Sequence, residues 1–126
     1  MRTIDQYFDI IDSAIRHSAA QTVEITYTVS SPTSGTVSAT LTFWDDSRLE
    51  FYEKVMIRAG RPVREKYRYQ YHKTRRTIIR YDNSPHHPGL PNFPHHKHVG
   101  RKVVGATEPT LGQVLKEIAT LMEREG

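Results

Sequence analysis

The apolar positions follow a helical period at both ends of the chain and a period of two between them. From Thr3 to about Ser18 the apolar residues recur every three or four positions, which predicts an amphipathic helix. A second stripe of the same period predicts a helix from Leu111 to Glu125. The residue pairs with the spacing of an N-terminal capping box are Thr3 with Gln6 and Thr110 with Gln113.

Between the helices, five stretches alternate apolar and polar residues, the pattern of strands with one buried face. Their approximate ranges are Val23–Val29, Val37–Phe43, Leu49–Ile57, Val63–His72 and Arg76–Asp82. Short turns join them, so we expect successive strands to pair antiparallel as a meander. Glu53 interrupts the apolar face of the third strand and indicates an edge or a bulge there.

The fold class that these elements predict is α+β, in a single domain spanning residues 1–126. An antiparallel sheet of about five strands, arranged as a meander, packs against an N-terminal and a C-terminal helix. One-sided alternation leaves the other face of the sheet in contact with water or a ligand. Residues 83–109 are expected to form a Pro/His-rich crossover segment within the domain.

Charge is distributed unevenly along the chain. Residues 54–102 hold thirteen Lys or Arg and two acids, whereas the remainder holds five Lys or Arg and twelve acids. This indicates a surface that binds a polyanion, although basic strand faces also serve simply to keep a sheet soluble. The absence of cysteine excludes disulfides and thiol chemistry and is typical of a cytoplasmic protein. No apolar run approaches the length of a membrane span, so we expect no membrane contact.

The fourth predicted strand has two faces of different chemistry. Alternation places Arg64, Lys66 and Arg68 on one face and three tyrosines on the other. We interpret the tyrosines as core residues and the basic face as a surface that contacts phosphates without reading bases. With neighbours on adjacent segments, the candidate nucleic-acid-binding residues are Arg64, Lys66, Arg68, Arg75, Arg76, Arg80 and Lys97.

The segment from Tyr81 to His98 combines prolines and histidines in a way that suits neither a helix nor a central strand. Its prolines recur at a step of three, which is the period of polyproline II. In that extended form His87 and His96 would lie ~28 Å apart. The two groups of histidines are therefore treated as separate unless the chain bends, and Gly89 is the least costly position for a bend.

Three interpretations of this segment remain open. Imidazoles bind metal ions, but the spacing matches no standard zinc signature, and we expect neither a metal nor another cofactor. Two histidines can instead act as base and acid on a phosphodiester, one taking a proton from a ribose 2′-hydroxyl and another protonating the leaving oxygen. Alternatively, the segment is a stiffened crossover whose histidines bond carbonyls or contact nucleic acid or a partner. The candidate catalytic residues are His86, His87, His95, His96, His98, Asp82 and Tyr81.

Asp82 and Tyr81 enter this set as groups that could orient a histidine. A carboxylate at a strand end fixes the tautomer of an imidazole that donates to it. The competing interpretation is that Asp82 simply forms a turn with the three residues that follow it.

The chain resembles the TumE-type toxins, a family of small proteins from bacterial and archaeal toxin–antitoxin modules. The stretches that carry the resemblance are R-Y-D-N-S-P-H-H-P-G-L-P-N-F-P-H-H-K-H (80–98), Y-R-Y-Q-Y (67–71) and E-P-T-L (108–111) before the C-terminal helix. The resemblance implies a toxin paired with a helix-turn-helix antitoxin encoded beside it. It carries over no catalytic residues, so the mechanism rests on the residues themselves.

We therefore expect a toxin that acts on RNA or another nucleic acid, as a metal-independent ribonuclease using histidine acid–base chemistry. The alternative is a non-enzymatic nucleic-acid-binding protein whose Pro/His-rich segment is structural or binds a partner. A homodimer would cover the edges of an unclosed sheet, although no residue specifies one.

Overall fold

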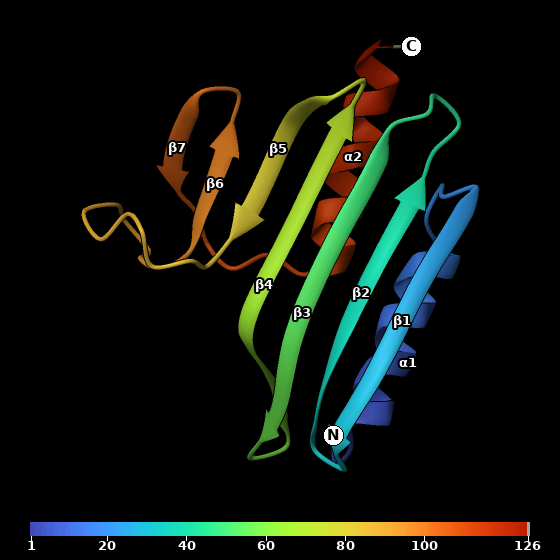
Figure 1. Cartoon of the computed structure of the whole chain (residues 1–126), viewed down its shortest axis with the longest axis vertical. Coiled ribbons are helices and arrows are strands. Elements are labelled where there is room, and N and C mark those ends of the chain that lie inside the picture. Colours follow the sequence, from blue (N-terminus) through green and yellow to red (C-terminus); the bar gives the residue numbers. More distant parts are fainter. Residues whose placement is uncertain (126) are drawn as a thin grey trace.

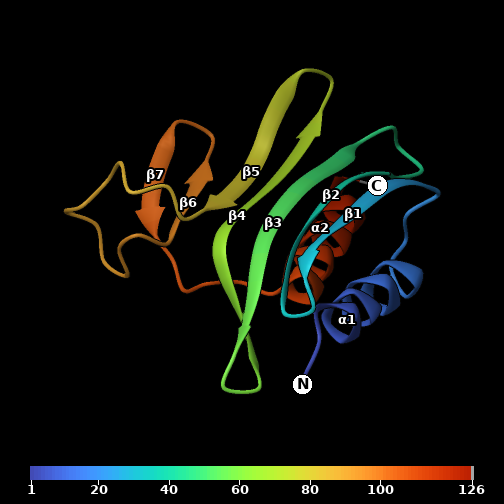
Figure 2. The same ribbon diagram turned by 60° about the horizontal axis from the view of Figure 1, so that its bottom comes forward.

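The computed structural model describes residues 1–125 as two helices packed on an antiparallel sheet of seven strands (Figure 1). In chain order the elements are α1 (Ile4–Arg16), β1 (Thr22–Ser31), β2 (Ser34–Thr42), β3 (Arg48–Arg58), β4 (Arg61–Lys73), β5 (Arg76–Asp82), β6 (His96–Val99), β7 (Lys102–Gly105) and α2 (Leu111–Glu125). Each strand pairs with the next one in sequence, so the sheet is a continuous meander. Both helices lie on the same side of the sheet (Figure 1, Figure 2).

The α+β class and the helix-covered antiparallel sheet are confirmed, but the sheet has more strands than the five or so predicted. The five predicted strands correspond to β1–β5. β6 and β7 form within residues 83–109, and each is four residues long. Alternation over four residues inside a proline-rich segment is too short a signal to predict a strand.

Capping boxes begin both helices, as the sequence predicts. Thr3 accepts from the amide of Gln6 at 3.3 Å, and the Gln6 side chain accepts from the amide of Thr3 at 3.2 Å. Thr110 and Gln113 exchange the same two bonds, at 3.1 and 2.9 Å. These bonds satisfy amides that have no partner within the helix and so define where each helix starts.

The core lies between the two helices and one face of the sheet. Leu41 and Leu49 from the sheet and Ile118 from α2 are completely buried there. Three tyrosines of β4, Tyr67, Tyr69 and Tyr71, are also buried, which confirms their interpretation as core residues. Each of the three hydroxyl groups bonds a polar partner, as a buried phenol requires.

A β-bulge between β3 and β4 changes the face on which Arg64 lies. The cross-strand pairs on either side of it are Lys54 with Lys66 and Val55 with Arg64. Glu65 is therefore the extra residue, and Arg64 points to the helix side of the sheet. The prediction that Arg64 shares a face with Lys66 and Arg68 is wrong, because an inserted residue reverses the alternation of everything before it.

The bulge accommodates the buried carboxylate of Glu53. Glu53 accepts hydrogen bonds from the hydroxyls of Tyr7 and Tyr69, and its oxygen lies 4.0 Å from the Arg64 guanidinium. Arg64 also lies 3.4 Å from Glu108, which precedes α2. The bulge that Glu53 indicates in the sequence is confirmed, and its polar network connects α1, β3, β4 and the segment leading into α2.

The face of β1–β4 that looks away from the helices is open (Figure 1). A row of directly paired residues crosses it in the order Thr26, Ser38, Tyr52, Arg68, Asp82 and His96. The sheet therefore places the histidine-bearing strand β6 in line with the basic strand β4. Within residues 1–125, neither helix is long and apolar enough to cross a membrane.

We predict that Arg64→Met lowers the free energy of unfolding by about 3 kcal/mol, because it leaves the buried Glu53 carboxylate without a cation. Urea denaturation measures this change. The control is Arg61→Met on the same strand, where the side chain is exposed, for which we expect a change within about 0.5 kcal/mol. Equal effects of the two substitutions would contradict the role of Arg64 in the core.

Candidate histidine site

The Pro/His-rich segment doubles back on itself. Residues 88–89 and 91–94 form turns. In the second turn Asn92 has a φ of 64°, and its carbonyl accepts from the amide of His95 at 2.8 Å. The bend expected near Gly89 is thus joined by a second one at Asn92, and together they return the chain to the sheet as β6.

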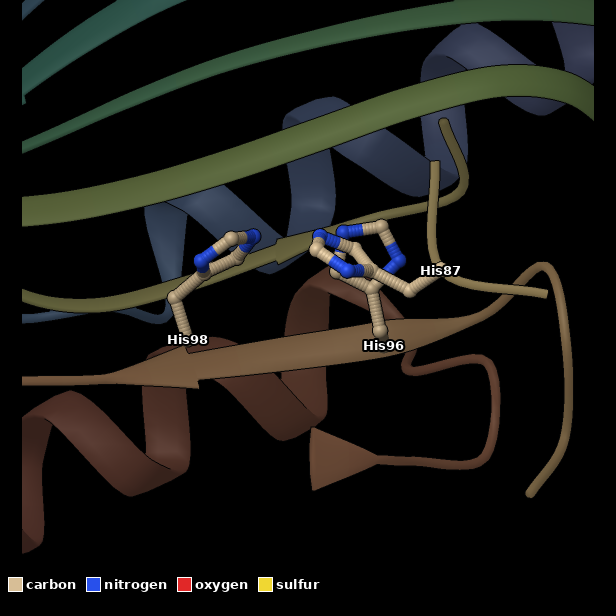
Figure 3. Close-up of side chains that lie close together, drawn as sticks. All are labelled: His87, His96 and His98. Carbon is tan, nitrogen blue, oxygen red and sulfur yellow. The ribbon is translucent and has the colours of Figure 1, made fainter. Parts of the chain in front are cut away.

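These bends bring His87, His96 and His98 together (Figure 3). The ring centroids are 5.1 Å apart for His87 and His96, 5.0 Å for His96 and His98, and 6.0 Å for His87 and His98. One nitrogen of each ring lies within 4.8 Å of the others. His96 and His98 project from the same face of β6, and His87 reaches them from the loop (Figure 3). The three residues form the histidine cluster.

Asp82, at the end of β5, supplies the carboxylate of the site. Its carboxylate lies 2.8 Å from Nε2 of His96 and 3.7 Å from Nε2 of His98. It also accepts from Nε of Arg80 at 3.1 Å and from the amide of Ser84 at 3.0 Å. Asp82 therefore contacts the histidines and also begins a turn, so the two interpretations of this residue are compatible. The buried carboxylate is thus surrounded by contacts from β5, from the turn after it and from β6.

His96 is contacted at both of its ring nitrogens. Nδ1 lies 3.0 Å from the carbonyl oxygen of Pro94, which can only accept, so Nδ1 donates to it. Nε2 lies 2.8 Å from the carboxylate of Asp82. Both side chains are buried, so this contact is shielded from water.

His98 is contacted by Arg80. The Arg80 guanidinium has no acceptor, and its Nη2 lies 3.0 Å from Nε2 of His98, so this nitrogen presents its lone pair. Burial lowers the pKa of His98 below its ordinary value, and the charge of Arg80 lowers it further. The surroundings of His98 therefore favour its neutral form.

Three imidazoles at this spacing are also able to hold a transition-metal ion. Here Nε2 of His96 contacts Asp82 and Nε2 of His98 contacts Arg80, and His96 uses both of its nitrogens. A metal ion bound by all three rings would have to displace at least one of these contacts. The geometry therefore fits hydrogen-bonded imidazoles better than a ready set of metal ligands.

The remaining candidate catalytic residues lie outside the cluster. His86 is exposed. His95 stacks on Tyr67 and places Nδ1 2.9 Å from its hydroxyl group. Tyr81 lies on the helix side and donates to Glu117 of α2 at 2.7 Å, and burial raises its pKa. The cluster therefore holds three of the five histidines that the sequence singles out, and Asp82 contacts two of them.

The candidate phosphate-binding cations are spread over both faces. Lys66 and Arg68 are exposed, and no ion pair involves either of them within residues 1–125. Arg80 belongs to the site itself. The cations placed elsewhere are Arg75 in the β4–β5 turn, Arg76 at the start of β5, Arg64 beside Glu53, and Lys97, which pairs with Glu117 at 2.6 Å.

In a comparison with known protein families, the family model described as Toxin TumE matches residues 8–125. The chain belongs to the TumE toxin family. It is accordingly the toxin component of a toxin–antitoxin system, with an antitoxin as its partner. No curated protein and no solved structure matches it significantly. The resemblance drawn from residues 80–98 is confirmed, and membership in the TumE family leaves the chemistry of the histidine cluster to its geometry.

The structure also identifies a residue that the sequence reasoning missed, Tyr52. This tyrosine lies on the open face, directly paired with Arg68, and is half-buried. Its position between Phe51 and Glu53 in an alternating strand is the signal that places it opposite the core. What the sequence could not supply is its cross-strand neighbour, because pairing register is a property of the assembled sheet.

We predict that Asp82→Asn lowers the free energy of unfolding by about 3 kcal/mol, because it disrupts the buried contacts that the carboxylate makes with His96, Arg80 and Ser84. Chemical denaturation at neutral pH measures the effect. Asp46→Asn is the matched control, since Asp46 is exposed and its positive φ suits asparagine. A loss no larger than in the control would contradict the structural role of Asp82.

We also predict that Arg80→Gln raises the pKa of His98 toward its ordinary value. The substitution removes the positive charge of Arg80, which disfavours protonation of His98. It also removes a partner of the Asp82 carboxylate, whose negative charge favours protonation of His98. Both changes act in the same direction. NMR titration of the imidazole signals measures the shift, and Arg76→Gln, in the same strand but outside the site, should leave the pKa of His98 unchanged.

Proposed function

We propose that this toxin cleaves RNA by acid–base chemistry in the histidine cluster, without a metal ion. The observation that carries the proposal is the proximity of two partly exposed imidazoles, His98 and His87, whose ring centroids lie 6.0 Å apart beside the Arg80 guanidinium. Acid–base catalysis needs one group that can take a proton and another that can give one, within reach of the same substrate. His98 and His87 offer two such groups within one small site.

The solvent exposure of each side chain indicates which residues of the site can contact the substrate. His96 and Asp82 are about 3% and 4% exposed, too buried to touch a phosphodiester directly. We assign them as positioning residues that hold the loop and the neighbouring rings. His98, His87 and Arg80 are only partly buried and are the groups that substrate can reach. His87 makes no hydrogen bond within the described part of the chain, so both of its nitrogens are available for proton exchange.

The proposed reaction begins when Arg80 turns from His98 to a phosphate oxygen and frees Nε2. His98 then takes the proton of a ribose 2′-hydroxyl, and the resulting oxygen attacks the adjacent phosphorus. His87, protonated, gives its proton to the departing 5′-oxygen, so the products are a 2′,3′-cyclic phosphate and a 5′-hydroxyl. Arg80 stabilises the charge that develops on the phosphorus oxygens. In this scheme His86, His95 and Tyr81 transfer no proton.

A second candidate function is a non-enzymatic nucleic-acid-binding protein. It is favoured by the contact of His96 with Asp82, because this contact anchors the returning loop to β5 whether or not chemistry occurs there. In that case the histidines stabilise the edge of the sheet. The basic residues Lys66 and Arg68 would bind phosphates without cleavage.

The proposal also includes two assembly partners. The antitoxin is of the helix-turn-helix type, as the resemblance of residues 80–98 implies. A homodimer is supported by β1, a ten-residue strand at the edge of the sheet that exposes Val23 and Val29. Such an edge presents unpaired backbone groups, and a second copy would satisfy them.

The decisive experiment incubates the purified toxin with single-stranded RNA, with and without EDTA. We expect cleavage that EDTA does not affect and that leaves cyclic phosphate ends. His98→Ala and His87→Ala should each reduce the rate at least about 100-fold, because each removes a proton carrier. His86→Ala is the control, since this exposed neighbour of His87 lies outside the cluster and should cleave at the original rate.

The outcomes separate the alternatives. RNA binding without cleavage, in protein that is correctly folded, would favour the non-enzymatic function. Cleavage that EDTA abolishes and added zinc restores would mean that the cluster holds a metal ion. Equal losses in His86→Ala and His98→Ala would mean that the assay does not report on the cluster.

A further inference from the structure

A groove crosses the open face of the sheet and ends at the histidine site. It encloses about 1010 Å³ between β1 and β5. Thr26 and Ser38 line the part of the groove that is far from the histidines, and Arg68 lines the part near them. Asp82 and Ser84 also line it, so the groove reaches the carboxylate that contacts two histidines of the cluster.

Tyr52 stands out in this groove because its side chain has no partner. The chain has seven tyrosines, and the hydroxyl groups of the other six all take part in hydrogen bonds. Within residues 1–125, the structure gives Tyr52 neither a hydrogen bond nor a ring contact, although it is half-buried in the groove. A tyrosine placed on the polar face of a sheet with nothing to bind is available to a ligand.

The cations next to Tyr52 are also unpaired. Arg68 is its direct cross-strand partner, and Lys66 lies two residues away on the same face. Both are exposed, and neither forms an ion pair within the described chain. By contrast, Arg64 and Lys97 on the helix side contact carboxylates. Free cations beside a free aromatic ring form the combination that binds single-stranded nucleic acid, with phosphates on the cations and a base on the ring.

We propose that this groove binds single-stranded RNA and that Tyr52 stacks on an unpaired base of it. The identity of the ligand rests on the proposed function. Tyr52 on β3 and the histidines on β6 are three strands apart, or about 14 Å at the usual strand spacing. A nucleic-acid strand covers this distance in two or three nucleotides. The stacked base therefore belongs to a nucleotide two or three positions from the bond that is cleaved, with Arg68 on a phosphate between them.

This arrangement selects single strands over duplexes. A base already paired and stacked in a duplex has no free surface for Tyr52, whereas an unpaired base does. Stacking uses the face of the ring and requires no particular base. The toxin should therefore prefer unpaired regions of RNA without strong sequence preference at this position.

The test measures binding of a fluorescein-labelled single-stranded oligonucleotide whose riboses are all 2′-O-methylated, so that the proposed reaction cannot occur. Fluorescence anisotropy gives the dissociation constant. We expect Tyr52→Ala to weaken binding roughly tenfold, through the loss of one stacked base. Tyr52→Phe should bind as the original protein does, because stacking needs the ring and not the hydroxyl group.

Two controls accompany these variants. Trp44→Ala removes an exposed aromatic residue from the β2–β3 turn, outside the groove, and should leave the affinity unchanged. A duplex of the same sequence should bind more weakly, and its affinity should not depend on Tyr52. Circular dichroism of each variant establishes that the fold is retained.

An unchanged affinity in Tyr52→Ala, or an equal loss in Tyr52→Phe, would overturn the stacking role. If the toxin binds no oligonucleotide and the antitoxin shields Tyr52 from solvent, the proposal is overturned. The groove would then be the binding site of a protein. These results are independent of the cleavage test, because the oligonucleotide cannot be cut. Failure of cleavage with intact, Tyr52-dependent binding would overturn the ribonuclease and leave this inference standing.

Discussion

The site depends on the buried carboxylate of Asp82. It lies at the end of β5, where it contacts His96 and His98 of β6, Arg80 of its own strand and the amide of Ser84 in the following turn. A carboxylate taken out of water is stable only when donors surround it, and here the donors come from β5, from the turn after it and from β6. Satisfying this carboxylate therefore joins β6 to the sheet.

A second buried carboxylate, Glu53, has the corresponding role on the helix side. Tyr7 of α1, Tyr69 of β4 and Arg64 at the bulge surround it. The buried polar contacts of this small domain are thus centred on these two carboxylates. Glu53 ties the helices to the sheet, while Asp82 ties the Pro/His-rich loop to its edge. Neither carboxylate contacts Lys66, Arg68 or Tyr52 on the open face of the sheet.

Local pattern predicted the elements whose signals are long or chemically distinct. The helices, their capping boxes and the strands β1–β5 follow from periodicity and side-chain chemistry that a few neighbouring residues supply. The position of Glu53 also indicated the bulge, because a charged residue on the apolar face of a strand needs a local change in strand pairing to accommodate it. The strands β6 and β7 were missed because four residues between turns carry too little pattern. Arg64 was placed on the wrong face because alternation cannot reveal an inserted residue.

The sequence by itself determined the family, the α+β architecture and the set of residues from which a site could be built. Tertiary structure alone decided which of those residues meet. His87 and His96 are nine positions apart and join one cluster because two turns reverse the chain, whereas His95 stacks on a core tyrosine although it adjoins His96. The physical reason is that His95 lies just before β6 and its ring stacks on Tyr67 in the core, whereas His96 begins the strand and pairs across it with Asp82. Proximity along the chain therefore says little about proximity in the site, which pairing register and loop closure establish together.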